Sequence, residues 1–215
     1  MEIGKGLSES LEYAQDAVWG KWVRWILLIV STIIFPLLLG YELEVYRGKK
    51  PAPELENWGN LFIDGLKLFV IQLIYAIPVI LVAMIFIGTG VILAISSPDA
   101  MMAAAGSFIV GLILVLIIAI VIGLVEMIGV VRFARLGRMG EAFNFGAIFE
   151  TIGKIGWLDY IFALVALFVV VFIIVMVLSL IPLIGMFLVL VLSPVIAIFT
   201  ARYVTMLYDS VPAAA

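Results

Sequence analysis

Long apolar stretches without charge dominate the chain and predict helices that cross a membrane. Leu68–Pro98 holds no charged residue over 31 positions, and Tyr160–Ala201 holds none over 42. Because a transmembrane helix needs about 20 apolar residues, the second stretch predicts two spans. Pro182 and Gly185 divide it, since proline stops a helix and glycine permits a tight turn. Pro78 predicts a kink in the first stretch.

We therefore predict an all-α integral membrane protein, a single membrane domain over 1–215 with about five transmembrane helices and amphipathic interfacial helices. The predicted spans lie near 22–41, 67–97, 106–131, 159–181 and 183–203. The first is short, because the apolar run from Trp25 to Gly40 covers about 24 Å as a helix against roughly 30 Å of hydrocarbon. This segment either spans with help from its flanks or is re-entrant.

Residues 1–21 show an amphipathic pattern that predicts a helix. Leu7, Leu11, Ala14 and Val18 recur at a spacing of three to four, and charged residues occupy the other faces. The pattern favours a helix that lies in the membrane interface on this apolar face. The alternative is a polar lead-in that packs on neighbouring loops.

Two further segments, 51–65 and 140–156, also predict interfacial structure. The first combines an extended start with a turn of helix, and in the second Asn144 and Gly156 are suited to begin and end a helix. Both either frame the bundle at the lipid headgroups or dock a partner. Aromatic side chains prefer the headgroup level. The predicted interfacial anchors are Trp22, Trp25, Trp58, Phe145, Phe149 and Trp157.

The composition supports a membrane protein and excludes several chemistries. Hydrophobic residues make up 66% of the chain and charged residues 13%, with a mean hydropathy of +1.34, which excludes a soluble globular domain. The chain has no cysteine and no histidine, which removes disulfides, thiolate nucleophiles, imidazole bases and thiol-bound metals. We expect no cofactor and no metal. A net charge of −3 argues against a nucleic-acid partner.

The distribution of basic residues predicts the orientation. With five spans, nine Lys and Arg residues lie on the side of the 47–67 and 132–154 connections and the C-terminus, and three lie on the other side. The positive-inside rule places those connections and the C-terminus in the cytoplasm of a multi-pass plasma-membrane protein. The N-terminus lies outside if the first segment spans and inside if it is re-entrant.

An ordered series of motifs resembles a known family. The first half contains Gly40-Tyr41, a Pro51/Pro53 turn, PELENWGNLFIDGLK and YAIP, and the second contains RFARLGRMGEAFNFGAIFETIGK, DYI, IPLIG and ARY. From about Leu11 to Tyr208, this series is similar to an archaeal membrane-protein family named domain of unknown function 4013. The resemblance implies an archaeal plasma-membrane protein, and it supplies no activity and no catalytic residue.

The candidate functional residues form one predicted polar layer. Glu126 is the clear ionisable residue inside a span, and such residues are costly unless they serve a function or are paired. The layer comprises Glu126, Gln72, Lys67, Thr200 and Arg202. One interpretation is a proton or cation site at Glu126; the other is a structural pair of Glu126 with Arg202 or Lys67.

Two functional hypotheses follow. The first is a non-enzymatic, self-associating scaffold or assembly partner that contacts membrane lipids, copies of itself and an unidentified membrane-protein partner. The second is a small ion or solute channel or carrier with Glu126 on the route. The scaffold is favoured, because a conduction path normally leaves polar residues along a helix face. Ser193-Pro194 could open backbone carbonyls for such a path, or it reflects ordinary helix packing.

Overall fold

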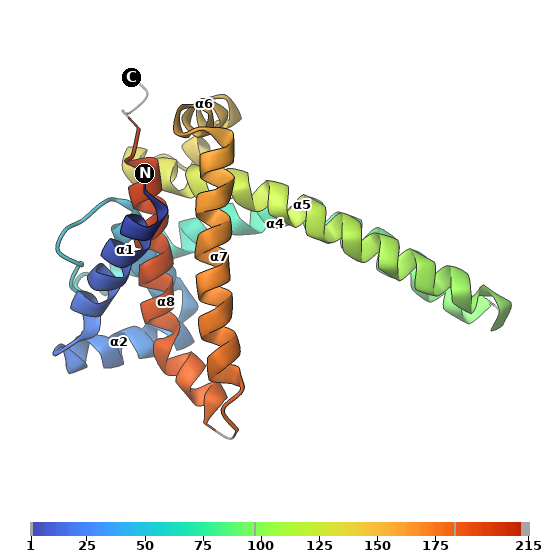
Figure 1. Cartoon of the computed structure of the whole chain (residues 1–215), viewed down its shortest axis with the longest axis horizontal. Coiled ribbons are helices and arrows are strands. Elements are labelled where there is room, and N and C mark those ends of the chain that lie inside the picture. Colours follow the sequence, from blue (N-terminus) through green and yellow to red (C-terminus); the bar gives the residue numbers. More distant parts are fainter. Residues whose placement is uncertain (1, 97, 183, 212–215) are drawn as a thin grey trace. The chain divides into compact units, whose positions relative to one another are not determined.

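The computed structural model of the chain describes residues 2–96, 98–182 and 184–211, and in these it contains helices and no strand (Figure 1). The predicted all-α class is confirmed. The chain divides into two units, which we call the body (Met1–Phe69 and Met127–Ala215) and the hairpin (Val70–Glu126). Two long helices, α4 (Trp58–Ser96) and α5 (Met101–Leu136), belong partly to each unit.

Within the described residues, four helices have the length and composition to cross a membrane. They are α4, α5, α7 (Trp157–Ser179) and α8 (Gly185–Tyr208). These helices agree with four of the five predicted spans. In place of the span near 22–41, the structure has two shorter helices, α2 (Trp22–Ile33) and α3 (Phe35–Tyr46).

The break between α2 and α3 has a local cause. Ile34 leaves the helical region at φ −95° and ψ 73°, and Pro36, in the first turn of α3, has no backbone N–H to continue the ladder of α2. Each twelve-residue helix is about 18 Å long, well short of a roughly 30 Å hydrocarbon core. The structure therefore has no single continuous helix over this segment, and whether the segment spans or is re-entrant stays a prediction.

In the body, α8 is the helix around which the others pack. It lies between α1 (Ile3–Val18) and α7 in Figure 1, and it also contacts α2, α3 and α6 (Phe145–Ile155). Its second half is buried on nearly every face. Gly185 begins α8 at a tight turn after α7, where an added Cβ would lie 2.3 Å from the Leu178 carbonyl oxygen.

The face of α1 that packs in the body includes Ala14 and Val18 of the predicted apolar face, together with Gly6 and Ser10. Its buried residues are mostly small ones: Gly6, Ser10, Ala14, Ala17 and Val18. Leu11 is 46% exposed. Small side chains let two helix backbones approach closely, which compensates for the loss of leucine contacts. The predicted N-terminal helix is present, and its position in the membrane interface stays a prediction.

Two glycines allow α3 to cross the first turns of α4 at backbone contact. A Cβ on Gly65 would lie 1.6 Å from the Pro36 carbonyl oxygen and 2.7 Å from the Gly40 nitrogen. A Cβ on Gly40 would lie 1.9 Å from the Leu61 carbonyl oxygen. Because backbone atoms cannot swing aside as side chains do, both positions require glycine.

The hairpin is held together by two phenylalanine rings that pack on glycines of the opposite helix. A Cβ on Gly111 would lie 2.4 Å from Cβ of Phe86, and one on Gly90 would lie 2.8 Å from the ring of Phe108. The Ser107 hydroxyl donates to the carbonyl oxygen of Phe86 at 3.2 Å. The contacts run in both directions between α4 and α5, so they fix the register of the hairpin.

The two predicted interfacial segments have different outcomes. Asn144 caps α6, since its side chain accepts a hydrogen bond from the Ala147 N–H, and Gly156 ends the helix at φ +97°, as predicted. The segment 51–65 has no separate helix: its extended part reaches Asn57, and α4 then begins directly at Trp58. A short 3₁₀ turn, η2 (Met139–Phe143), precedes α6, and another, η1 (Pro98–Ala100), precedes α5.

The crossing of α3 and α4 gives a direct test. We expect Gly65→Ala to destabilise the protein by about 3 kcal/mol or more, because the methyl group would overlap backbone atoms. Gly59→Ala, in the first turn of the same helix, meets open space and is the matched control. The free energy of unfolding in detergent, followed by tryptophan fluorescence, measures both. Equal stability of the two variants would contradict the close crossing.

Candidate functional site

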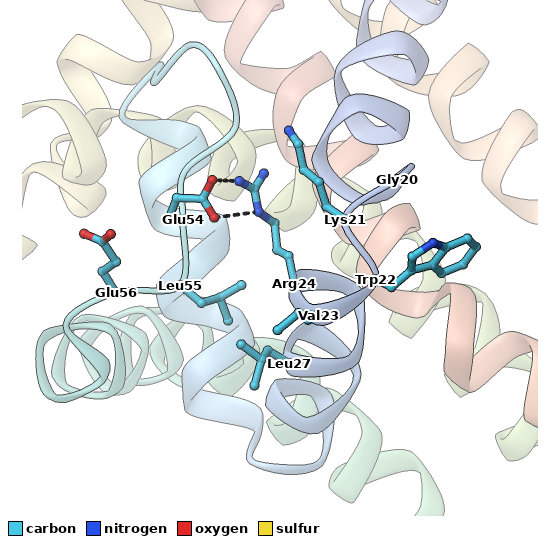
Figure 2. A pocket seen from close by; sticks show the side chains of 9 residues that line it. All are labelled: Gly20, Lys21, Trp22, Val23, Arg24, Leu27, Glu54, Leu55 and Glu56. Carbon is cyan, nitrogen blue, oxygen red and sulfur yellow. Dashed lines mark hydrogen bonds and ion pairs between the residues drawn. The ribbon is translucent and has the colours of Figure 1, made fainter.

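A polar pocket of about 570 Å³ lies at the start of α2, between its first turn and the segment that precedes α4. Figure 2 shows its central feature, the guanidinium of Arg24 facing the carboxylate of Glu54. Arg24 Nε donates to Glu54 Oε2 at 2.9 Å, and Nη2 contacts Oε1. The side chain of Arg24 is buried, whereas Glu54 is exposed. This paired geometry fixes both groups in position.

The basic groups of this pocket are already occupied. Arg24 Nη1 also donates to the Ala17 carbonyl oxygen at 3.3 Å, and Lys21 Nζ donates to the Asp16 carbonyl oxygen at 2.8 Å. These bonds tie α2 to the end of α1 across Gly20, which has a φ of +71°. The pocket therefore functions as a structural junction more readily than as an anion site.

A second ionic network joins α3 to the start of α4. Arg47 donates to Asp64 at 2.7 Å, and Lys67 donates to the same carboxylate at 2.8 Å. Arg47 and Lys49 also form ion pairs with Glu44. Burial by itself lowers the pKa of Arg47, but its bonds to Asp64 and Glu44 outweigh burial and raise that pKa.

A third network fixes the connection between α5 and α6. The buried Arg132 donates to Glu141 Oε2 at 2.8 Å, and Asn144 donates to the same oxygen at 3.3 Å. Arg138 donates to Glu141 Oε1 at 2.8 Å. The hydrogen bond from Arg132 is the main reason that the pKa of Glu141 lies below its usual value. Because that pKa is lowered, the bond stabilises the fold above the ordinary carboxyl pKa and is lost as the pH falls.

These networks resemble a structural frame more than a reaction centre. In residues 2–96, 98–182 and 184–211 no group of three or more acidic side chains is arranged to hold a metal ion. The carboxylates of Glu44, Glu54, Asp64 and Glu141 are each engaged by a cation. Such pairs position helices and loops.

The predicted polar layer is divided between the two units. Gln72 and Glu126 belong to the hairpin, and Lys67, Thr200 and Arg202 belong to the body. Lys67 pairs with Asp64, and the guanidinium carbon of Arg202 lies 4.9 Å from the centre of the Tyr13 ring. The hairpin contains no lysine or arginine of its own. The layer as a whole stays a prediction.

The backbone carbonyls near Pro194 are occupied. Proline lacks the N–H that would bond the Leu190 carbonyl oxygen, and the Ser193 hydroxyl donates to that oxygen instead at 2.8 Å. Trp25 Nε1 donates to the neighbouring Val191 carbonyl oxygen at 3.0 Å. These two hydrogen bonds support ordinary helix packing, and not an open row of carbonyls for a conduction path.

The predicted anchors differ in their exposure. Trp25 is half-buried because of its bond to α8, and it stacks on Trp22 at 5.7 Å between ring centres. The other five are exposed: Trp22 at 61%, Trp58 at 38%, Phe145 at 49%, Phe149 at 45% and Trp157 at 47%. The ring centres of Phe149, in the middle of α6, and Trp157, at the start of α7, lie 6.0 Å apart.

Residues that sequence reasoning missed are the glycines and small residues at helix crossings.

A model of a family described as a protein of unknown function, DUF4013, matches residues 25–183. The chain belongs to this family. No curated protein and no solved structure matches it.

Contacts within the body of this DUF4013 protein bring α1 and the end of α3 beside the last turns of α8. The Ser10 hydroxyl lies 3.5 Å from the Met206 sulfur, so α1 lies beside the last turns of α8. Thr205 Oγ1 donates to the Val45 carbonyl oxygen at 3.4 Å, so the end of α3 lies there too. Trp25, in the first turn of α2, donates to Val191 near the start of α8, so α2 begins and α3 ends at different levels of α8, and the choice between a span and a re-entrant pair stays a prediction.

The re-entrant alternative predicts the labelling of single cysteines, which the cysteine-free DUF4013 chain makes simple. In oriented vesicles, we expect Lys5→Cys and Ser210→Cys to react with an impermeant maleimide from the same side. Asp99→Cys, between the spans α4 and α5, should react from the opposite side. Reaction of the first two from opposite sides would contradict the re-entrant pair.

Glu42, in α3 of the DUF4013 fold, gives a prediction of pH dependence. Its side chain is half-buried, and burial raises its pKa to about 7. The folded state thus binds more protons than the unfolded state, so stability falls as the pH rises from the ordinary carboxyl pKa to about 7. We expect Glu42→Gln to raise the unfolding temperature at pH 8 and to leave it unchanged at pH 4. Glu12→Gln, at an exposed position, is the control for charge removal.

Proposed function

We propose that this protein is a non-enzymatic membrane scaffold whose copies associate through the hairpin. It is a membrane protein of a family of unknown function, with four helices suited to cross the bilayer in its described part. The observation that carries the proposal is the composition of the hairpin surface. Two helices form this unit, and large aliphatic side chains cover its outward faces.

The internal packing of the hairpin does not use these outward side chains. Gly90, Phe108, Gly111 and Phe86 join α4 to α5, whereas Ile113 and Ile120, one heptad apart on α5, are 51% and 63% exposed. Lipid tails provide no hydrophobic driving force, so two hairpins would associate through van der Waals contacts between fitted surfaces. A second copy of the hairpin offers a surface of the same shape and chemistry.

The body supplies anchorage to the membrane. Its ionic networks hold α6, whose aromatic face carries Phe145 and Phe149, and the exposed Trp22 lies at the start of α2. Aromatic side chains on rigid helices favour the headgroup region, which suits a scaffold with a fixed position in the bilayer. A plasma-membrane location and cytoplasmic basic connections belong to the same proposal.

Native mass spectrometry of the protein released from native-lipid particles tests the scaffold. We expect a fixed number of copies greater than one. Ile113→Ala combined with Ile120→Ala should shift the protein toward the monomer, because it removes methyl groups from the outward face and leaves the hairpin apolar. Val165→Ala with Val169→Ala, on the exposed face of α7, is the matched control.

Two results would contradict this proposal. A wild-type monomer would exclude self-association as the function. An oligomer that the hairpin variant leaves intact, or that the α7 variant disrupts equally, would place the association surface outside the hairpin.

A channel or carrier is the second candidate, and Glu126 is the residue that favours it. This half-buried carboxylate lies in a spanning helix of a unit that has no cation of its own. Glu126→Gln should then change ion flux in proteoliposomes, with Asp99→Asn at the exposed connection of α4 and α5 as control. Equal ion flux in the wild type and the Glu126→Gln variant would show that Glu126 is not part of the conduction route.

A further inference from the structure

An apolar groove of about 380 Å³ lies in the body among α1, α7 and α8. The side chains that line it are aliphatic or aromatic, apart from the polar Ser8 of α1. The residues that define its three sides are Leu7 and Leu11 of α1, Val170 and Ile174 of α7, and Val195 and Phe199 of α8. A volume of this size suits a slender apolar ligand.

The groove exists because α1 packs with its small residues. Gly6, Ser10 and Ala14 are buried on the face of α1 that packs on α8. The face that carries Leu7 and Leu11 therefore lines the groove. Leu11 remains 46% exposed. The described part of the chain thus leaves the leucine face of an amphipathic helix over an apolar cavity.

The position of the groove identifies its occupant. Its walls on α7 and α8 come from the uncharged stretch Tyr160–Ala201, in two helices of membrane-spanning length and composition. The solvent around such segments is the hydrocarbon of the bilayer. The outer faces of α1 carry exposed charged residues such as Glu12 and Asp16, which keep this helix at the headgroup level.

We propose that the groove is a lipid-binding site, in which one alkyl chain of a membrane lipid lies beneath α1 between α7 and α8. The chain contacts the leucine face of α1 on one side and Val195 and Phe199 on the other. The chain enters the groove from the surrounding hydrocarbon and not from water, so close van der Waals contact with the groove walls stabilises the complex. This site is independent of the proposed association through the hairpin.

Photolabelling tests the site in vesicles of phosphatidylcholine that include a phosphatidylcholine with a diazirine at the end of one acyl chain. After irradiation, mass spectrometry of peptides locates the label. We expect Leu11 and Ile174 to be labelled several-fold more than Phe172, which is exposed on α7 outside the groove. Val195→Trp should fill the groove and remove this excess. Leu190→Trp, at an exposed position of the same helix outside the groove, should leave it intact.

Leu11→Trp fills the groove from α1 and replaces Val195→Trp if that variant does not fold. Labelling of Leu11 and Ile174 at the level of Phe172 would overturn the proposal, because it indicates ordinary contact with surrounding lipid. Excess labelling that survives both tryptophan variants would overturn it too. Peptide cross-links between two protomers at these residues would assign the groove to a second copy instead.

Discussion

Close packing of helices against α8 is the constraint on which the body depends. In a bilayer, apolar side chains gain little by leaving lipid for protein, so helices associate where backbones can approach closely. Gly6, Ser10 and Ala14 permit this approach for α1, and Gly185 permits it at the turn from α7. Once these contacts exist, Arg202 is buried beneath the Tyr13 ring, where a cation–π contact compensates part of its desolvation.

The ionic networks depend on that packing. Arg135 donates to the Tyr46 carbonyl oxygen at 3.0 Å and pairs with Asp209 at 2.7 Å, so the end of α5 is tied to the ends of α3 and α8. Exposed pairs of this kind contribute little on their own, but several at one location fix the angles of the helices that carry them. The buried pair of Arg132 with Glu141 acts similarly on α6, and its exposed aromatic face then has a defined position.

The sequence predicted the features that depend on local pattern. Long apolar stretches located α4, α5, α7 and α8, and cap residues located the start and end of α6 at Asn144 and Gly156. The break at Ile34 was open to sequence reasoning through the short apolar run and Pro36, but hydropathy alone does not distinguish a short span from two half-length helices. The pattern of α1 indicated its apolar face, but hydropathy gave no signal that Gly6 and Ser10 would be buried. In close helix packing, the smallest side chains mark the contact face.

The candidate site was less accessible to sequence than the fold. The partners of Lys67 and Arg202, which are Asp64 and Tyr13, follow from tertiary packing that spacing along the chain does not encode. Likewise, no pattern pairs Arg24 with Glu54, 30 residues away. The close crossing at Gly65 had a sequence signal, because a glycine stands inside a helical stretch. The sequence does not show that the backbone of Pro36 is the group that packs against it.

The most direct test of this account is a disulfide between α1 and α8. The chain has no native cysteine, and the side chains of Ser10 and Met206 are in contact. In native membranes, the Ser10→Cys and Met206→Cys double variant should form an intramolecular disulfide under mild oxidation. The matched Ser8→Cys and Met206→Cys variant should not, because Ser8 is exposed on another face of α1. Absence of the first cross-link, or equal formation of both, would contradict the packing of α1 on α8.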